Sequence, residues 1–131
     1  TIFMGQVLRG DPVTVIGDGK QTRCFTYIDD AIRATVEAGL SDRVVGEVFN
    51  VGTNVETSIL ELAETMIRIA GSPSKVAFLP QESVYGESYE DVPRRVPSVQ
   101  RMHEILGVRA ETLLEKGLRH TIEWFRAGNG R

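Results

Sequence analysis

The 131 residues, of which 41% are hydrophobic, provide enough chain for one hydrophobic core of ordinary size but not for two. A formal net charge of −3, with Lys and Arg scattered along the chain, argues against nucleic acid or an anionic membrane as the partner. The single cysteine, Cys24, excludes an internal disulfide, and the sequence shows no leader or long apolar run, which together predict a cytoplasmic location.

The chain begins with a pattern typical of a helix. Phe3, Val7 and Leu8 have helical spacing, yet no capping residue precedes them and there is no initiator methionine. We therefore expect that the chain starts inside an element and that an upstream segment is missing. Residues 11–19 then predict a short strand that ends in a tight Gly-Asp-Gly turn.

The remaining pattern alternates strands with helices. Further strands are predicted at 24–28, 47–52 and 75–80, and helices at 29–38, 59–70, 99–106 and 113–125. Helix starts are predicted at 29–30, Ser58, Ser98 and Thr112, with capping boxes from Ser58 to Glu61 and from Thr112 to Glu115, and helix stops at Gly39, Gly71 and Gly107. Residues 81–95 predict an ordered polar loop. Short strands among helices indicate an α/β fold with a small sheet and packed helices.

Two arginines are the candidate ligand-binding residues. Arg23 ends the loop after the Gly-Asp-Gly turn and Arg95 ends the polar loop, and each guanidinium offers paired hydrogen bonds that match phosphate oxygens. Two such arginines would clamp one diphosphate. Spacing alone favours ordinary surface ion pairs instead, Arg23 with 29–30 and Arg95 with 90–91, each worth at most about 1 kcal/mol.

Other chemistries find less support in the sequence. His103 and His120 have no second ligand at metal-binding spacing, so no metal site is predicted and both are expected at the surface or in helix packing. Cys24 lies in an apolar strand without a nearby histidine and is predicted to be a buried small hydrophobe. Residues 17–19 lead into a strand rather than a helix, so they do not form a dinucleotide fingerprint.

Six motifs in order resemble the second half of the extended short-chain dehydrogenase/reductases, the NAD-dependent nucleotide-sugar epimerase and dehydratase family. The motifs are residues 13–23, 25–30, 49–52, 91–98, 106–107 and 114–118. Each is weak alone, and their order and spacing make the set specific. Residues 21–26 and 85–92 look most like the branch that oxidises and decarboxylates UDP-glucuronate, with the UDP-sugar 4-epimerases next.

The resemblance implies a substrate site. Residues 1–131 would be the nucleotide-sugar binding domain, truncated at its amino terminus and without its Rossmann domain. The residues that the resemblance assigns to substrate binding are Arg23 and Arg95 at the diphosphate, Gln21 beside them, the strand backbone around Val15 at the nucleobase, and Tyr85 and Tyr89 as a cover. The diphosphate clamp is then favoured over the two surface ion pairs.

The family's catalytic residues do not occur in this chain. Its glycine-rich NAD loop is absent, and Tyr27, Tyr85 and Tyr89 are not followed by the lysine of the Tyr-x-x-x-Lys pair. The chain by itself is therefore predicted to be inactive, with no catalytic residue and no bound cofactor. NAD would belong to the parent enzyme, and this chain would bind and orient a nucleotide sugar, with a UDP-sugar favoured.

The resemblance also bears on partners. Residues 24–39 are expected to pack against the missing Rossmann half, so that the isolated chain exposes apolar surface and favours a homodimer. The alternative is a stand-alone small α/β module that binds or interacts without catalysis. A self-sufficient hydrolase would need a nucleophile–base pair, which the sequence does not offer.

Overall fold

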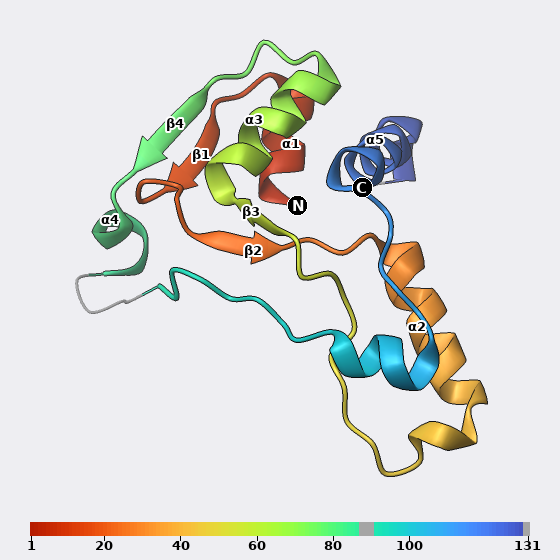
Figure 1. The fold of residues 1–131 in the computed structure, drawn as a ribbon. Coiled ribbons are helices and arrows are strands. Elements are labelled where there is room, and N and C mark those ends of the chain that lie inside the picture. Colours follow the sequence, from red (N-terminus) through yellow and green to blue (C-terminus); the bar gives the residue numbers. More distant parts are fainter. Residues whose placement is uncertain (87–90, 130–131) are drawn as a thin grey trace.

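The computed structural model describes residues 1–86 and 91–129 and shows two small sheets with helices packed around them (Figure 1). The strands are β1 (Val13–Ile16), β2 (Thr22–Cys24), β3 (Glu56–Ser58) and β4 (Val76–Leu79). The helices are α1 (Ile2–Arg9), α2 (Ile28–Leu40), α3 (Ile59–Ala70), α4 (Gln81–Tyr85) and α5 (Leu114–Trp124), with short helical turns η1 (Asp42–Val44), η2 (Met102–Leu106) and η3 (Phe125–Asn129). The predicted α/β class with a small sheet is confirmed.

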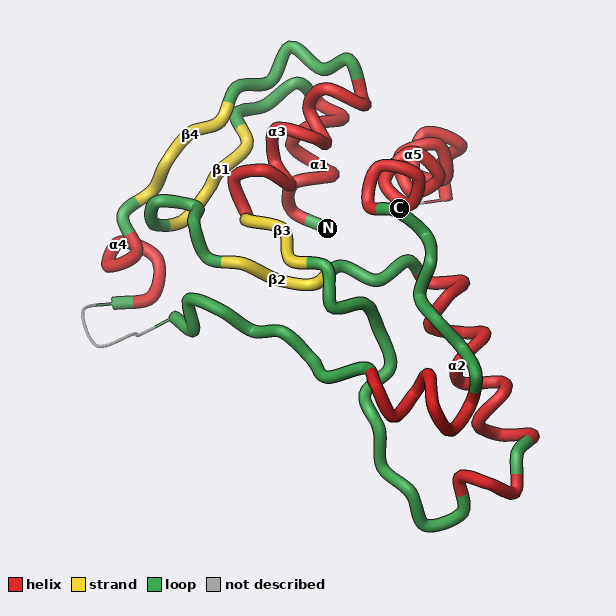
Figure 2. Tube along the Cα trace, in the orientation of Figure 1, coloured by secondary structure: helices red, strands yellow, loops and turns green. Residues whose placement is uncertain are grey.

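Each sheet has two strands. β1 pairs with β4 in parallel, from Val13 opposite Val76 to Ile16 opposite Leu79. β2 pairs with β3 in antiparallel fashion, and an isolated parallel bridge from Thr22 to Arg94 places the segment 91–95 along β2. Figure 2 shows this segment as a loop that runs beside β2 after the short helix α4. The last residues of the predicted polar loop 81–95 therefore lie against the sheet.

The larger core lies between β1, α1, α3 and α5. Val13 and Val15 of β1 are fully buried because alternate side chains of a strand point to the same face. Ala63 and Met66 of α3 meet them from the apolar face that the sequence predicts for this helix. The other buried members of the cluster are Met4, Val7 and Ile122.

A second, smaller core joins α2 to η2. Its buried members are Ala34, Met102, Leu106 and Val108. Our expectation from chain length was one core. The structure divides the apolar residues because α2 leaves the sheets and packs against the segment near residues 102–108, as Figure 1 shows.

The predicted cap of α3 is confirmed, and the caps predicted for α2 and α5 are wrong. Ser58 caps α3, since its Oγ accepts the N–H of Glu61 at 3.1 Å, and Gly71 ends that helix in the left-handed conformation. α2 begins one residue before the predicted start, with Tyr27 at the cap position, and it continues past Gly39 to Leu40. α5 has Leu113 at its cap position and no side-chain cap.

The reason for both misplaced caps is one tertiary contact. Asp30 is 7% exposed, and its Oδ2 accepts the N–H of Thr112 at 2.9 Å while its Oδ1 accepts from Arg33 at 3.0 Å. Burial favours a raised pKa for Asp30, but the hydrogen bonds from Thr112 and the charge of Arg33 outweigh it and lower that pKa. Asp30 therefore joins α2 to the start of α5 instead of capping its own helix.

Two further segments differ from the sequence expectation. Residues 47–52 are not a strand, because no strand in the described part of the chain lies beside them to complete a ladder, and Val48 and Val51 are exposed. The predicted loop 81–95 begins with the single-turn helix α4. Ser98 does not cap a helix through its side chain, and its carbonyl accepts from Asn50 Nδ2 at 3.0 Å.

The sequence also predicted the exposure of both histidines and the burial of the cysteine. His103 and His120 are exposed, as predicted, and the ring of His120 meets Tyr27 edge-on at 5.6 Å. Cys24 is only partly buried, contrary to the expectation, and burial raises the pKa of its thiol. In residues 1–86 and 91–129, no helix has the length and apolarity that crossing a membrane would require.

Candidate functional site

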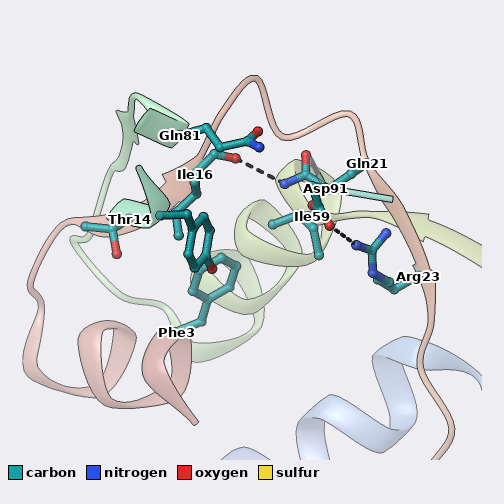
Figure 3. A pocket seen from close by; sticks show the side chains of 9 residues that line it. Phe3, Thr14, Ile16, Gln21, Arg23, Ile59, Gln81 and Asp91 are labelled. Atoms are coloured by element: carbon teal, nitrogen blue, oxygen red, sulfur yellow. Dashed lines mark hydrogen bonds and ion pairs between the residues drawn. The ribbon is translucent and has the colours of Figure 1, made fainter. Parts of the chain in front are cut away.

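An open cavity of about 270 Å³ lies beside β1, where the loop before β2 and the helix α4 meet (Figure 3). Nine side chains from five parts of the chain line it. They are Phe3, Thr14, Ile16, Gln21, Arg23, Ile59, Gln81, Tyr85 and Asp91. Three of the residues assigned to the substrate site from sequence, Gln21, Arg23 and Tyr85, are thus brought together.

The edge of β1 that faces away from β4 forms one wall. The N–H groups of Val13 and Gly17 donate to the carbonyls of Lys75 and Leu79, each at 2.9 Å. The backbone N–H and C=O groups of Thr14 and Ile16 therefore point away from β4. Val15 itself points its side chain into the core. The cavity is lined by its neighbours Thr14 and Ile16.

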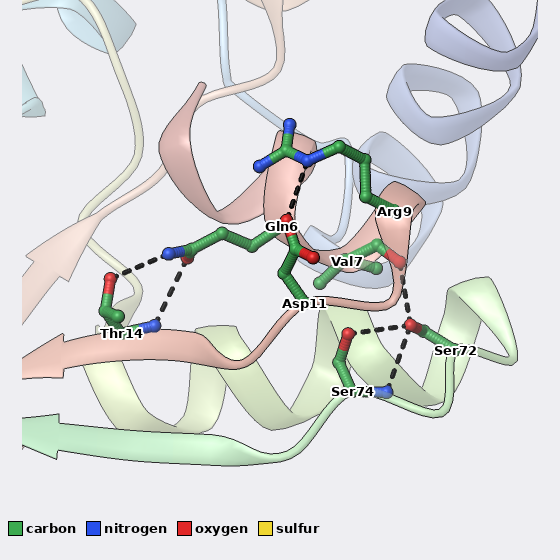
Figure 4. A network of polar contacts seen from close by, with 7 residues as sticks. All are labelled: Gln6, Val7, Arg9, Asp11, Thr14, Ser72 and Ser74. Atoms are coloured by element: carbon green, nitrogen blue, oxygen red, sulfur yellow. Dashed lines mark hydrogen bonds and ion pairs between the residues drawn. The ribbon is translucent and has the colours of Figure 1, made fainter.

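Two glutamine side chains bind this edge. Gln6 Nε2 donates to Thr14 Oγ1 at 2.9 Å, and Gln6 Oε1 accepts the Thr14 N–H at 3.2 Å (Figure 4). Gln21 Nε2 donates to the carbonyl of Ile16 at 3.1 Å, as the dashed line in Figure 3 marks. The edge is therefore held in place by two polar side chains, of which Gln21 also lines the cavity.

The loop between β1 and β2 covers the start of α3. The N–H of Leu60 donates to Gly19 O at 3.0 Å and that of Ile59 to Gln21 O at 3.1 Å. These groups and the capped N–H of Glu61 are the donors that a helix start normally offers to phosphate. These three N–H groups at the start of α3 are therefore already hydrogen-bonded within the chain.

Arg23 is the cation on the cavity wall. Its side chain is 18% exposed, and Nη2 pairs with Asp91 Oδ1 at 2.8 Å. Nη1 donates to the carbonyls of Thr22 at 2.7 Å and Val92 at 2.8 Å. The ion pair with 29–30 that spacing favoured is wrong, because the partner comes from a segment that only the fold brings close.

Arg95 lies on the segment beside β2 and does not line the cavity. The Thr22 N–H donates to Pro93 O at 2.9 Å, and Cys24 Sγ approaches Arg95 O at 3.9 Å, so the segment follows β2 through this stretch. Its side chain is exposed and has no ion pair with any residue that the structure describes. Asp91, one of its two expected partners, is used by Arg23. Tyr89 and Glu90 lie outside the described residues.

Sequence reasoning missed Glu56 and Arg94 beside this site. Arg94 Nη2 donates to Glu56 Oε1 at 2.7 Å and Arg94 Nε to Glu56 Oε2 at 3.1 Å. Hydrogen bonds from Arg94, then from Thr22, lower the pKa of Glu56. The two residues are 38 positions apart, and no local spacing signal connects them.

The residues present do not fit NAD. β1 is followed by the 17–19 turn and then by β2, whereas a dinucleotide fold places a helix after its glycine-rich turn, with the pyrophosphate at that helix's start. Tyr27 packs against His120 and Gly117 and has no lysine partner among its described contacts. No step through NAD is derived for this chain.

Comparisons with known proteins agree with the fold and the motifs. The NAD dependent epimerase/dehydratase family matches residues 1–52. The chain is 42% identical to UDP-N-acetyl-alpha-D-glucosaminuronate decarboxylase of Bacillus cytotoxicus, over 95% of this chain and 38% of that protein. It is 34% identical to UDP-glucuronic acid decarboxylase 1 of Xenopus tropicalis, over 95% of this chain and 28% of that protein.

Solved structures show the same relationship. UDP-glucose 4-epimerase of Thermotoga maritima with UDP-glucose superposes with a TM-score of 0.84 at 32% identity, over 97% of this chain and 38% of that chain. UDP-glucuronic acid 4-epimerase of Bacillus cereus, in complex with UDP-glucuronic acid and NAD, superposes with a TM-score of 0.82 at 31% identity, over 97% of this chain and 40% of that chain.

These matches define the class of protein. The fold corresponds to the carboxy-terminal part of extended short-chain dehydrogenase/reductase epimerases, and the chain spans two fifths or less of the length of these relatives. The chain is similar in sequence and fold to part of nucleotide-sugar epimerases and decarboxylases, and the NAD dependent epimerase/dehydratase family model matches its residues 1–52. The resemblance drawn from its motifs is confirmed.

Proposed function

We propose that residues 1–131 form a nucleotide-sugar binding domain, whose cavity beside β1 holds the nucleotide diphosphate for an NAD-dependent epimerase, decarboxylase or dehydratase. A UDP-sugar is favoured, since the relatives named above act on or were solved with UDP-sugars. The catalytic residues and NAD would belong to a Rossmann half outside this chain, in a cytoplasmic enzyme. The observation that carries the proposal is Arg23 on the cavity wall.

Arg23 retains donors for a phosphate. The contacts described above use both hydrogens of Nη1 and one of Nη2, out of the five N–H donors of a guanidinium. With respect to residues 1–86 and 91–129, Nε and one Nη2 hydrogen are left for the ligand. Because three protein oxygens hold the group, its orientation is set before the ligand arrives, which reduces the ordering cost of binding.

Arg95 supplies the second arm of the clamp. Thr22 lies opposite Arg94 in parallel register, so the next residue on each strand, Arg23 and Arg95, forms the next pair. Successive side chains of an extended segment point to opposite faces. The side chains of Thr22 and Arg94 both donate to the carboxylate of Glu56, so they lie on the same face of β2. Arg23 and Arg95 then share the opposite face, as a two-armed diphosphate site requires.

The nucleobase would lie against the edge of β1. The Thr14 N–H is bonded to Gln6, so the Thr14 carbonyl, the Ile16 backbone and the Gln21 amide are the groups proposed to meet the polar edge of a uracil. Phe3 and Tyr85 contribute aromatic rings to the same cavity, which favours stacking on a planar base. The proposal assigns the base to this wall and the diphosphate to the arginines.

The direct test is a titration of the 131-residue chain with UDP and with UDP-glucuronate, followed by the backbone amide signals. We expect shifts confined to residues 14–23 and 91–96. Arg23→Ala should abolish them, whereas Arg68→Ala, which removes an exposed arginine paired with Glu115, should leave them unchanged. The proposal fails if the wild-type chain gives no shifts at millimolar UDP, or if Arg23→Ala binds as well as wild type.

The exposed apolar face of α2 supports docking of another polypeptide. Ile28, Ile32, Val36 and Leu40 recur every four residues, and each is at least half exposed. We propose that the Rossmann half covers this face in the intact enzyme and that isolated chains use it to form a homodimer. The same face is what a stand-alone interaction module would offer, and such a module would bind no UDP in the titration above.

A further inference from the structure

Arg94 and Arg95 are adjacent on an extended segment, and only one of them can face Arg23. Neighbouring side chains on extended chain point to opposite faces. Arg94 turns to Glu56, which leaves Arg95 on the face of Arg23. The alternation therefore places one of two chemically identical arginines on the face of Arg23.

The backbone alone holds this register weakly. Among the described residues, the backbone pairing of β2 with the segment 91–95 is confined to the isolated bridge of Thr22 with Arg94, in which the Thr22 N–H donates to Pro93 O at 2.9 Å. Pro93 and Pro97 have no N–H to add to the ladder. A slip of one residue exchanges the two faces of a strand, and here it would put Arg94 in the place of Arg95.

Glu56 opposes this slip from the far side of β2. Its carboxylate accepts two hydrogen bonds from Arg94 and a third from Thr22 Oγ1 at 2.9 Å. Glu56 itself lies on β3 opposite Cys24, so one side chain links β3, β2 and the segment 91–95. A bidentate pair of this kind fixes orientation as well as charge.

We propose that Glu56 is a positioning residue for nucleotide-diphosphate binding: by holding Arg94 on the opposite face of β2, it sets the register that presents Arg95 beside Arg23. This inference rests on the proposed function of the cavity. It adds that the two arginines are not interchangeable while Glu56 is present, and that they become interchangeable when its charge is removed.

The test is a double-mutant cycle on UDP affinity in the full 131-residue chain, measured by amide shift titration. In the wild-type background, Arg95→Ala should weaken UDP binding about tenfold, the effect of one charge-assisted hydrogen bond. In the Glu56→Gln background, Arg95→Ala should weaken UDP binding by about threefold or less, because the Arg94 side chain then reaches the ligand. A purely structural role of Glu56 would lower stability without altering the dependence on Arg95.

Two controls complete the design. Glu115→Gln breaks an exposed ion pair of similar length, 2.7 Å to Arg68, and should leave the tenfold effect of Arg95→Ala intact. The exchange Glu56→Arg with Arg94→Glu should restore the dependence on Arg95, because it rebuilds the pair. Equal costs of Arg95→Ala in the wild-type and Glu56→Gln backgrounds would overturn the inference and leave the proposed function standing.

A second readout does not depend on the ligand. Nuclear Overhauser contacts between Thr22 and Arg94 report the register directly, and we expect Glu56→Gln to weaken them and to add contacts between Arg23 and Arg94. If wild-type chain binds no UDP, the proposed function fails, and this measurement still decides whether Glu56 sets the register. Unchanged contacts in Glu56→Gln would refute that role.

Discussion

The side chains of Arg23 and Asp91, 68 residues apart in the sequence, meet at 2.8 Å on the cavity wall. Asp91 holds one end of the guanidinium while two backbone carbonyls hold the other. A lysine ammonium is a point charge that cannot match this planar arrangement. The geometry at Arg23 thus depends on the shape of the group as well as on its charge.

Arg23→Lys should accordingly weaken UDP binding by about tenfold, although the net charge is conserved, because oriented charge-assisted hydrogen bonds are lost. Isothermal titration with UDP at one fixed salt concentration measures the effect. Arg68→Lys, at an exposed arginine on α3, is the matched control and should bind UDP like wild type. Equal affinity of the Arg23→Lys and wild-type chains would mean that charge alone attracts the diphosphate.

Asp30→Asn should destabilise the chain by about 1–3 kcal/mol at neutral pH, because the Thr112 N–H and Arg33 lose a charged acceptor. Urea unfolding followed by circular dichroism measures this. Asp29→Asn, at the exposed neighbour in the same helical turn, should have little effect.

The carboxyl group of Asp30 also predicts that the folding stability of the chain depends on pH. The pKa of Asp30 is lowered in the folded chain, so its stabilising contribution is complete above the unfolded value of about 3.9 and is lost as the pH falls through the folded value. The stability difference between wild type and Asp30→Asn should therefore shrink below about pH 4. A difference that stays constant from pH 7 to pH 3 would contradict the assignment.

Gly19→Ala should destabilise the loop that shapes the cavity. Gly19 has φ of 71°, and a Cβ there would lie 2.8 Å from Val15 Cγ1 and 3.0 Å from Leu60 Cβ. Strain and overpacking together should cost about 2 kcal/mol or more. Gly107→Ala is the matched control, since Gly107 has φ of 70° with open space around it, so the difference in unfolding free energy isolates the steric part.

Ile32→Glu should reduce self-association of the isolated chain. Ile32 lies in the exposed apolar stripe of α2, so the change should alter folding stability by no more than about 0.5 kcal/mol while it removes apolar contact area between chains. Size-exclusion chromatography with light scattering, over a range of concentrations, gives the mass. Wild-type chain that remains a monomer throughout would rule out the proposed homodimer.

Local sequence determined the elements whose stabilising contacts are local. α3 begins at Ser58 and ends at Gly71 because a hydroxyl caps its first turn and a glycine adopts the left-handed conformation at its end. β1 and β4 follow from short β-branched or apolar runs. The ordered motifs also pointed to the similarity with nucleotide-sugar epimerases and decarboxylases that the comparisons found, and through it to the candidate residues at the cavity.

Tertiary structure decided every feature whose partner is remote in the chain. Asp30 serves Thr112 rather than its own helix, Arg23 pairs with Asp91 rather than with 29–30, and residues 47–52 remain without a neighbouring strand among the described residues. The physical reason is common to all three. A charged group or a strand edge is stabilised by whichever complementary group the fold brings within bonding distance, and propensity within a short window carries no information about that group.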